Sequence, residues 1–600
     1  MKAFSRFIYL GIAPIVFLAV VGNQSSFART PQKSSDDPDT RAQQLHSLFN
    51  EEWEYELRIS PQMATALGDN RYNDRLDDNS PEAIHADIEE KKKFLMRFES
   101  IKADGLSSQD ALSLELMVRG LKDEIEAAQF KGWEMPVNQM SGPHLEFIDM
   151  ASLMPFKTVH DYENYLSRLH QIPRVVDQTM ANMRQGMRDR LMPPRYLLEK
   201  VVVQIDEVAG TFGEASPFAQ PVKEFSKDIS SLDQQRLKSE ALEVINNEIV
   251  PAYKRFATFV RNDYVPQGRS QPGVWALPDG EVRYRFNIRH MTTTNLSAEQ
   301  IHQIGLEQLA KTEGEMLALA QKLGYKDLAS LNNHIKKERQ FYATSGQQLL
   351  DLYTRYSRQM QAELPKLFGR LPKSKLSIIP METFRSKNAV PADYTAGASD
   401  GSRDGRINVN QWDPEHRLLL NIEAIAYHEG VPGHHLQISI AQELSDLPAF
   451  RRYGGYTAFV EGWALYSERL GKEIGFYQDP YSDYGRLENE MWRNIRLVID
   501  TGVHEKHWSR DQMVAYFHRY TAMDEPNVQT EVDRYIAWPG QALAYKLGQL
   551  DILRLREKAS KALGNKFDLR AFHDEVIGSG PLPLDVLDSH VETWIAAQQK

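Results

Sequence analysis

Apolar residues recur every three or four positions along most of this chain. Between Gln43 and Leu57, for example, they occupy positions 45, 48, 49, 53 and 57. This spacing places them on one face of an amphipathic helix. Similar patterns predict helices at 81–98, 107–130, within 157–210, and at 232–259, 297–323, 346–367, 456–474, 480–508, 510–520, 527–536, 540–556, 569–576 and 585–598. The sequence therefore predicts a mainly α fold.

Serine and proline indicate where several of these helices begin or break. Ser297-Ala-Glu-Gln300 is a capping box that opens the helix ending near residue 323. Proline has no backbone N–H to donate within a helix. We therefore expect Pro173 and the pair Pro193-Pro194 to break the stretch 157–210, and Pro251 to interrupt the stretch 232–259.

Three short stretches predict β-structure instead. Residues 274–289 alternate apolar and polar side chains around Pro278-Asp279-Gly280, a hairpin-like pattern. Residues 376–384 are apolar and β-prone, and residues 406–412 alternate. We expect the last two to pair as a small sheet, with the turn-rich loop that contains Tyr394 between them.

The length of 600 residues favours two or more structural units. Composition shifts near Asn262, so we expect an N-terminal helical region at 41–262 and a second region, with the sheet and the candidate site, at 263–600. Hydrophobic content of 42% and charged content of 26% are ordinary for a globular protein. Net charge is −11 with no dominant basic patch, so nucleic acid is not an expected partner.

The N-terminus has the pattern of a secretory signal. Lys2 and Arg6 precede an apolar run at 7–21, and small residues favour cleavage after Ala28. We expect a signal peptide at 1–28 and a flexible leader at 29–40; an uncleaved anchor is the alternative. The chain has no cysteine, which excludes disulfides, thiolate ligands and lipid attachment through an N-terminal cysteine. The expected location is periplasmic or secreted, with no membrane contact after cleavage.

Residues that could bind a metal ion or act in catalysis are concentrated in the stretch 421–437. His428, Glu429, His434 and His435 fall within eight positions. Imidazoles are neutral ligands of catalytic zinc, and a neighbouring carboxylate that does not bind the metal can serve as a base. The alternative is a surface loop or a core with incidental histidines. The cluster favours a zinc site, although Mn or Co would also suit His and Glu ligands.

The spacing differs from His-Glu-x-x-His, whose histidines at i and i+4 share one helix face. Here position i+4 from His428 is Pro432, and His434 at i+6 lies about 240° round a straight helix. Pro432 disfavours a continuous helix, and glycines at 430 and 433 tolerate unusual dihedrals. We expect a helix that breaks after Glu429 and a bulge that brings His434 close to His428. His435 is expected to be a supporting or substrate-side group.

A third ligand is expected from the next helix. Glu461 lies in an otherwise apolar run, where a carboxylate is costly unless it is paired or binds metal. Glu468, seven residues on, is the alternative third ligand, although its neighbour Arg469 could explain it as an ordinary ion pair. Glu429 is then the expected general base and later the proton donor to the leaving amine.

Other polar side chains are candidates to complete the site. His504, Tyr535 and Tyr545 could stabilise a developing oxyanion. Arg403 and Asn410 could bind a substrate backbone along an exposed strand edge, and Gln541 is a further substrate-side candidate.

Several motifs together resemble the bacterial domain-of-unknown-function family 885. They are His428-Glu429-Gly-Val-Pro-Gly-His434-His435-Leu-Gln437, Glu461-Gly-Trp-Ala-Leu-Tyr-Ser-Glu468, Tyr535-Ile-Ala-Trp-Pro-Gly-Gln541-Ala-Leu-Ala-Tyr545, Asp400-Gly-Ser-Arg403 and Asp500-Thr-Gly-Val-His504. That family is in turn similar to gluzincin metallopeptidases of the helical oligopeptidase and thermostable carboxypeptidase types. The resemblance implies two helical halves around a deep cleft, with a small sheet beside the metal-binding helix. It also implies one zinc ion held by His428, His434 and Glu461, with Glu429 as base.

The function expected from these features is a zinc-dependent metallopeptidase that cleaves short peptides. The alternatives are a zinc amidase acting on a non-peptide or cell-wall amide, and a non-catalytic peptide-binding protein on a peptidase scaffold.

Overall fold

The computed structural model describes residues 37–382, 386, 389–398 and 401–600. The expected signal peptide at 1–28 and the leader up to residue 36 lie outside these ranges, as does Asp400 of the family motif. The mainly α class with a small sheet is confirmed. The boundary near residue 262 stays a prediction.

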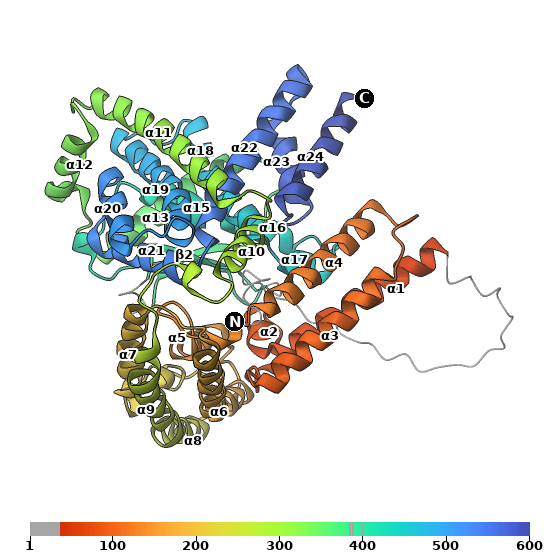
Figure 1. The fold of residues 1–600 in the computed structure, drawn as a ribbon, viewed down its shortest axis with the longest axis vertical. Helices are drawn as coiled ribbons and strands as arrows, with labels where there is room; N and C mark the ends of the chain where they lie inside the picture. Colours follow the sequence, from red (N-terminus) through yellow and green to blue (C-terminus); the bar gives the residue numbers. More distant parts are fainter. Residues whose placement is uncertain (1–36, 383–385, 387–388, 399–400) are drawn as a thin grey trace.

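Helices of the N-terminal region form two groups in Figure 1. The first group holds α1, α3 and α4, which lie side by side, together with the short α2; the second holds α5 to α9. Their bounds are α1 Pro38–Ile59, α2 Pro61–Ala66, α3 Pro81–Glu99, α4 Ser108–Gln129, α5 Pro143–Met150, α6 Val159–Asp189, α7 Arg195–Ala209, α8 Ser231–Val244 and α9 Val250–Phe259. The break expected at Pro173 is wrong, because α6 continues through it. Near Pro251 the helix is interrupted as predicted, by a π-helical turn at Ile245–Ile249.

The remaining helices belong to the part of the chain that holds the candidate site. They are α10 Gly280–Thr292, α11 Ala298–Lys322, α12 Leu328–Lys337, α13 Gly346–Leu367, α15 Ile422–Glu429, α16 His434–Gln442, α17 Ala449–Tyr453, α18 Thr457–Glu473, α19 Pro480–His504, α20 Arg510–Tyr520, α21 Glu525–Ala537, α22 Ala544–Leu563, α23 Leu569–Gly578 and α24 Leu584–Gln599. The capping box at Ser297 opens α11 as predicted. Helices α18 and α22 pack so closely that a Cβ on Gly548 would lie 1.8 Å from the carbonyl oxygen of Ala458.

The hairpin expected around residues 278–280 is wrong, because helix α10 begins at Gly280. Tyr284 and Ile288, four residues apart, are buried in a cluster with Val274 and Leu277. A pattern with apolar residues at every second position also fits a helix, because every fourth residue then lies on one helix face. Packing against other parts of the chain therefore decided between strand and helix here.

The small sheet contains β1 Leu376–Pro380, β2 Ala392–Thr395 and β3 Gly405–Val409 in the order β1-β3-β2. Strand β3 pairs with β1 in parallel, with Leu376 opposite Gly405, and with β2 in antiparallel, with Ala392 opposite Val409. The predicted pairing of the first and last strands is confirmed. Strand β2 falls in the stretch that was expected to be only a loop.

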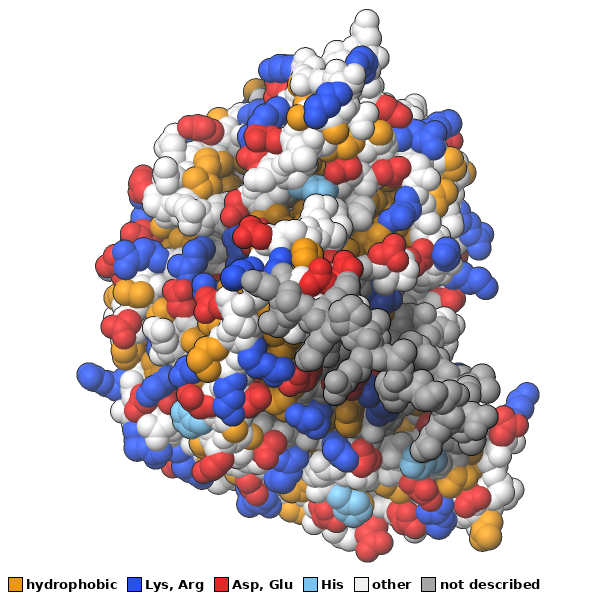
Figure 2. Space-filling model, turned by 90° about the vertical axis from the view of Figure 1, so that its right-hand side faces the viewer, with side chains coloured by type: hydrophobic (Ala, Val, Ile, Leu, Met, Phe, Trp, Pro, Cys, Tyr) orange, Lys and Arg blue, Asp and Glu red, His pale blue; other side chains and the backbone are white. Residues whose placement is uncertain are grey.

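Charged side chains of both signs are interspersed over the face shown in Figure 2. Among the described residues, no helix is both long and apolar enough to cross a bilayer.

Three buried histidines predict that the protein loses stability in acid. Burial lowers the pKa of His504 and His573 to about 3, and that of His144 to about 4. The unfolded chain binds protons at these sites below about pH 6.5, whereas the folded chain does so only near its lower pKa values. The contribution of these three histidines to the free energy of unfolding should therefore hold its full value above about pH 6.5 and fall between there and pH 3, by up to about 1.4 kcal/mol per pH unit for each histidine. Burial raises the pKa of Asp500 and that of Glu488 to about 7, and these carboxyl groups contribute in the opposite direction over the same range.

Urea unfolding at pH 7 and pH 5 measures this dependence. His144→Gln removes one of the three buried imidazoles, so its free energy of unfolding should fall less between pH 7 and pH 5 than that of the wild type. The same change in the free energy of unfolding between pH 7 and pH 5 in the wild type and in His144→Gln would contradict the prediction.

Candidate metal centre

The central helix of the site is interrupted between its two histidines, as the spacing predicted. Helix α15 ends at Glu429 and α16 begins at His434. In the connection, the Gly433 N–H donates to the carbonyl of Tyr427 at 3.0 Å, and the Val431–Pro432 peptide bond is cis. The indole N–H of Trp463, on α18, donates to the carbonyl of Pro432 at 2.9 Å. The connection is therefore held by both its own helix and its neighbour.

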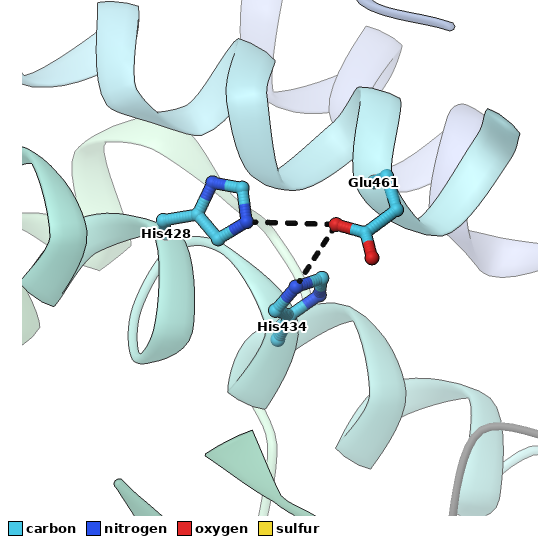
Figure 3. Close-up of side chains that lie close together, drawn as sticks. All are labelled: His428, His434 and Glu461. Carbon is cyan, nitrogen blue, oxygen red and sulfur yellow. Dashed lines mark ion pairs between the residues drawn. The ribbon is translucent and has the colours of Figure 1, made fainter. Parts of the chain in front are cut away.

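This connection brings His428 and His434 together with Glu461 from α18. Nε2 of His428 lies 3.6 Å, and Nε2 of His434 lies 3.5 Å, from the same Oε2 of Glu461. One ligand atom from each residue lies within 4.8 Å of the others. Figure 3 shows both rings and the carboxylate directed toward one point. The two imidazole planes are nearly perpendicular, at 89°.

These separations fit a divalent ion. Zinc binds nitrogen and oxygen at about 2.0–2.2 Å, so neighbouring ligand atoms of a tetrahedral site lie about 3.4 Å apart. Oε2 of Glu461 is buried and has no hydrogen-bond partner among the described residues, although a buried carboxylate oxygen normally has one. Burial would raise the pKa of Glu461, but the two histidines hold it well below its usual range. The three residues therefore offer an anionic, partly desolvated ligand set.

Glu468, the alternative third ligand, lies on the other side of the His428 ring. Its Oε1 is 2.9 Å from Nδ1 of His428, while Nε2 of the same ring points to Glu461. Glu468 is buried, and Arg493 lies 3.6 Å from the same Oε1. A carboxylate at Nδ1 keeps the proton there and leaves Nε2 free to bind a metal. The geometry makes Glu468 a support of His428, not a member of the converging set.

Glu429 belongs to the same site without joining the three converging groups. Burial raises the pKa of Glu429 to about 8; the charge of His434 opposes this shift and that of Glu461 adds to it. A carboxyl group with a pKa near neutrality can both take up and release a proton.

Two of the expected catalytic groups are fully engaged by the protein. His504 accepts from the Val274 N–H at Nδ1 and donates to the Tyr535 carbonyl from Nε2, both at 3.0 Å. The Tyr535 hydroxyl donates to Glu531 at 2.5 Å and accepts from Trp492 and Arg496 at 2.9 and 2.8 Å. The structure does not bring either side chain to the converging ligands.

Tyr545 and Gln541 lie near the ligands. The ring of Tyr545 is almost parallel to that of His428, with centroids 6.5 Å apart. Its hydroxyl accepts from Arg534 at 2.8 Å, and Arg534 also donates to Oε1 of Gln541 at 2.9 Å. Because this hydroxyl accepts from neighbours, its own proton can be donated to another group.

The other expected substrate-side residues lie around the sheet. His435 is buried, with Nδ1 3.0 Å from the Tyr394 hydroxyl and Nε2 3.2 Å from the Ser374 carbonyl. Arg403 donates to the carbonyl of Ala66 at the end of α2, at 3.1 Å. Asn410 is buried and holds the Ser386 carbonyl at 2.7 Å. Asn410 directly follows β3, the central strand, so it does not lie on a sheet edge.

Sequence reasoning missed three polar residues near the ligands. Asn489 donates to Oε2 of Glu468 at 3.4 Å, and Arg493 and Arg534 are described above. The sequence contained a signal for Asn489 and Arg493, because polar residues recur at 489, 493 and 496 on one face of the helix expected at 480–508.

A cavity of about 780 Å³ lies between α4, α10 and the beginning of α18. Its lining includes Tyr456 and Thr457, and Thr457 stands four residues before Glu461 on the same helix face. A smaller cavity of about 50 Å³ is lined by Asn489 and Trp492 of α19. Space therefore exists beside the helices that carry the site.

Replacement of Glu468 by Gln is expected to weaken metal binding about 10- to 100-fold, the usual effect of losing a carboxylate that orients a metal-binding histidine. The amide can still accept from Nδ1 of His428 but cannot offset the charge of Arg493. Competition with a chelator measures the affinity. The control is Glu473→Gln at the C-terminal end of α18, where the carboxylate pairs with Arg556. Equal affinity of wild type and Glu468→Gln would contradict a supporting role.

Comparison with known proteins gives a family and a fold. Residues 61–591 match the family model described as "Bacterial protein of unknown function (DUF885)". A search of the curated proteins found no match. The crystal structure of a "putative lipoprotein" from Colwellia psychrerythraea has a TM-score of 0.87 and 28% identity, over 93% of this chain and 99% of that one. A "putative lipoprotein of unknown function" from Shewanella oneidensis has a TM-score of 0.66 and 17% identity, over 91% and 99%.

These neighbours overturn the expected location. Both are described as lipoproteins, a class of proteins anchored to a membrane, whereas the sequence indicated a periplasmic or secreted protein without an anchor. The expectation rested on the signal-peptide pattern at 1–28 and on the absence of cysteine, and neither feature says where relatives of this chain are located. The periplasmic or secreted assignment is therefore withdrawn.

Proposed function

Since this chain belongs to the DUF885 family of bacterial proteins, for which no function is given, we propose from its own residues that it is a zinc-dependent metallopeptidase that cleaves short peptides. The observation that carries the proposal is the convergence of His428, His434 and Glu461 on one point. A fourth residue, Glu429, directly follows His428 in the chain and is not one of the three converging groups. Two histidines and one glutamate are the zinc ligands of one class of catalytic zinc hydrolases, and a separate carboxyl group can serve as its base.

Each residue has a role in peptide hydrolysis. A zinc ion bound by the three ligands would supply Lewis-acid polarisation of the scissile carbonyl. Glu429 takes a proton from the attacking water, whose oxygen bonds to the carbonyl carbon. The C–N bond then breaks, and Glu429 passes the proton to the leaving amine. Glu468 fixes the orientation of His428 throughout.

The ligand set also supports the proposed relationship to gluzincin peptidases, in which two histidines and a glutamate from a following helix bind zinc. The longer histidine spacing is accommodated by the connection between α15 and α16. The cavity of about 780 Å³ reaches the start of α18 at Tyr456 and Thr457, and its lining does not include His428, His434 or Glu461.

Metal analysis combined with digestion of a mixed peptide library tests the proposal. We expect about one zinc per chain, peptide fragments detected by mass spectrometry, loss of cleavage with a chelator, and recovery when zinc is restored. Failure to hold zinc after reconstitution would favour a non-catalytic binding protein. Bound zinc with uncut peptides would favour the hydrolysis of a different amide.

A further inference from the structure

The smaller cavity, of about 50 Å³, has a buried carboxyl group in its lining. Glu488 on α19 is 8% exposed. Its Oε1 accepts from the Ala522 N–H at 2.7 Å, whereas its Oε2 receives no hydrogen bond from the described residues. Oε2 is not fully enclosed by the protein, in contrast to the buried polar atoms that lack a partner. Because Glu488 lines the cavity, this oxygen is open to a group that enters it.

The lining of this cavity carries more negative than positive charge. Its charged side chains are Glu488, Asp524 and Arg417. Arg417 interacts with Asp524, and neither of them acts on Glu488. Among the described residues, the cation that acts on Glu488 is Lys336, which is exposed on α12, so solvent and salt screen its charge.

The buried charges behind the lining balance one another and do not offset Glu488. Three guanidinium groups face three carboxyl groups there, namely Arg493, Arg496 and Arg534 against Glu429, Glu468 and Glu531. Glu488 therefore has no buried counter-charge within the described part of the chain, and burial raises its pKa to about 7. A carboxyl group in this situation gains from the entry of a cation.

The cavity lies beside the candidate metal centre. Asn489 lines it and donates from Nδ2 to Glu468 of that centre at 3.4 Å. Tyr353 lines it too, and the charge of Glu429 acts on the Tyr353 hydroxyl. The same cavity therefore borders the support of a metal-binding histidine and the expected general base.

Size and reach favour a small group at the end of a flexible chain. A water-sized group needs about 10–15 Å³ of such space, so the cavity holds a few heavy atoms, as in an ammonium group and the carbon that bears it. Ile422, also in the lining, precedes His428 by six residues, or about 9 Å along the axis of α15. Lysine carries its ammonium group on a four-carbon stem, which suits a binding site at some distance from the cut bond.

We propose that this cavity binds a primary ammonium group of the substrate, with Glu488 as its counter-charge and Asn489 as a second acceptor, so that peptides with such a group near the cut bond are preferred. The inference rests on the proposed function and names its substrate class. The ammonium group can come from a lysine side chain or from a free N-terminus. It brings one positive charge and three donors, whereas an apolar group would leave Oε2 of Glu488 without a partner.

Peptides that differ in one ammonium group test the proposal on the zinc-loaded full chain. In a short alanine peptide, each position in turn carries lysine or norleucine, which keeps the four-carbon stem without the ammonium group. We expect kcat/KM to be about 10- to 100-fold higher with lysine at one position near the cut, the usual value of hydrogen bonds to a charged group. Loss of cleavage on acetylation of the N-terminus, with no effect of norleucine, would assign the cavity to the N-terminal ammonium group.

Glu488→Gln should reduce this preference to within a few-fold, because the amide still accepts from the Ala522 N–H but carries no charge. A thermal melt checks that the variant folds. The control is Glu505→Gln, the same change at an exposed position directly after α19, and the preference should persist there. A preference that persists in folded Glu488→Gln would overturn the assignment to this cavity.

Binding of n-butylammonium gives a readout that does not depend on turnover. Relative to 1-butanol at the same concentration, it should raise the melting temperature of the wild type and not that of Glu488→Gln. Equal shifts in the two proteins, with equal cleavage of lysine and norleucine peptides and no effect of N-terminal acetylation, would overturn this inference and leave the proposed peptidase in place. A shift confined to the wild type, with no peptide cleaved, would overturn the proposed function and leave the ammonium site in place.

Discussion

Replacing Glu429 by Gln is expected to leave about one zinc per chain and to lower kcat/KM by about 10³-fold, within the usual contribution of a positioned general base. The amide has nearly the shape of the carboxyl group but cannot take a proton from water. Metal binding persists because the converging atoms belong to His428, His434 and Glu461. Elemental analysis and peptide kinetics on the same preparation give both values.

The exposed Glu415 provides a matched control, because Glu415→Gln makes the same chemical change a short distance earlier in the chain. It should retain both zinc and activity. Cleavage by Glu429→Gln at the wild-type rate would exclude Glu429 as the base, and loss of zinc from this variant would place Glu429 among the ligands.

Gly433→Ala is expected to weaken zinc binding by about 100-fold or more. A Cβ at this position would lie 2.0 Å from the carbonyl oxygen of His428 and 2.5 Å from that of Tyr427, so the backbone must move. Gly433 directly precedes His434, and a displacement of about 1 Å in a site of fixed geometry can cost about 100-fold. Competition with a chelator measures the affinity, and a thermal melt reports the accompanying loss of stability.

Gly314→Ala on α11 is the matched control, because nothing lies within 4 Å of its Cβ. Alanine in a helix is more favourable than glycine by roughly 0.5–1 kcal/mol, so this variant should be slightly more stable and bind zinc normally. Wild-type zinc affinity in Gly433→Ala would show that the tight connection is not needed to bring the histidines together.

The break between His428 and His434 illustrates what local sequence can predict. Proline at i+4 and a glycine on each side are incompatible with a continuous helix, and these restrictions act within a few residues. The same holds for the helices with strong apolar periodicity and for the capping box at Ser297, which were found as predicted. The hairpin near Gly280 failed because its alternating pattern also fits a helix face, and packing against distant residues decided the outcome.

In the candidate site, too, the local sequence predicted which residue types are present, and tertiary packing decided their contacts. Sequence reasoning singled out Glu461 and Glu468, which lie seven residues apart on one face of α18, about 10 Å along its axis. The structure places them on opposite sides of the His428 ring, with Glu461 at Nε2 and Glu468 at Nδ1. Arg469, the neighbour that suggested an ordinary ion pair for Glu468, lies 3.8 Å from Glu490 instead.

The sequence by itself determined the mainly helical class, the broken helix at Pro432 and the residue types available for metal chemistry, because these depend on short-range sterics and periodicity. Only the tertiary structure decided which carboxylate meets which ring nitrogen, that His504 and Tyr535 are engaged elsewhere, and that Arg493 and Arg534 contact Glu468 and Tyr545. Those outcomes depend on how α15, α18, α19 and α21 cross one another. Crossings are set by the packing of side chains that are far apart in the chain, and no local spacing encodes them.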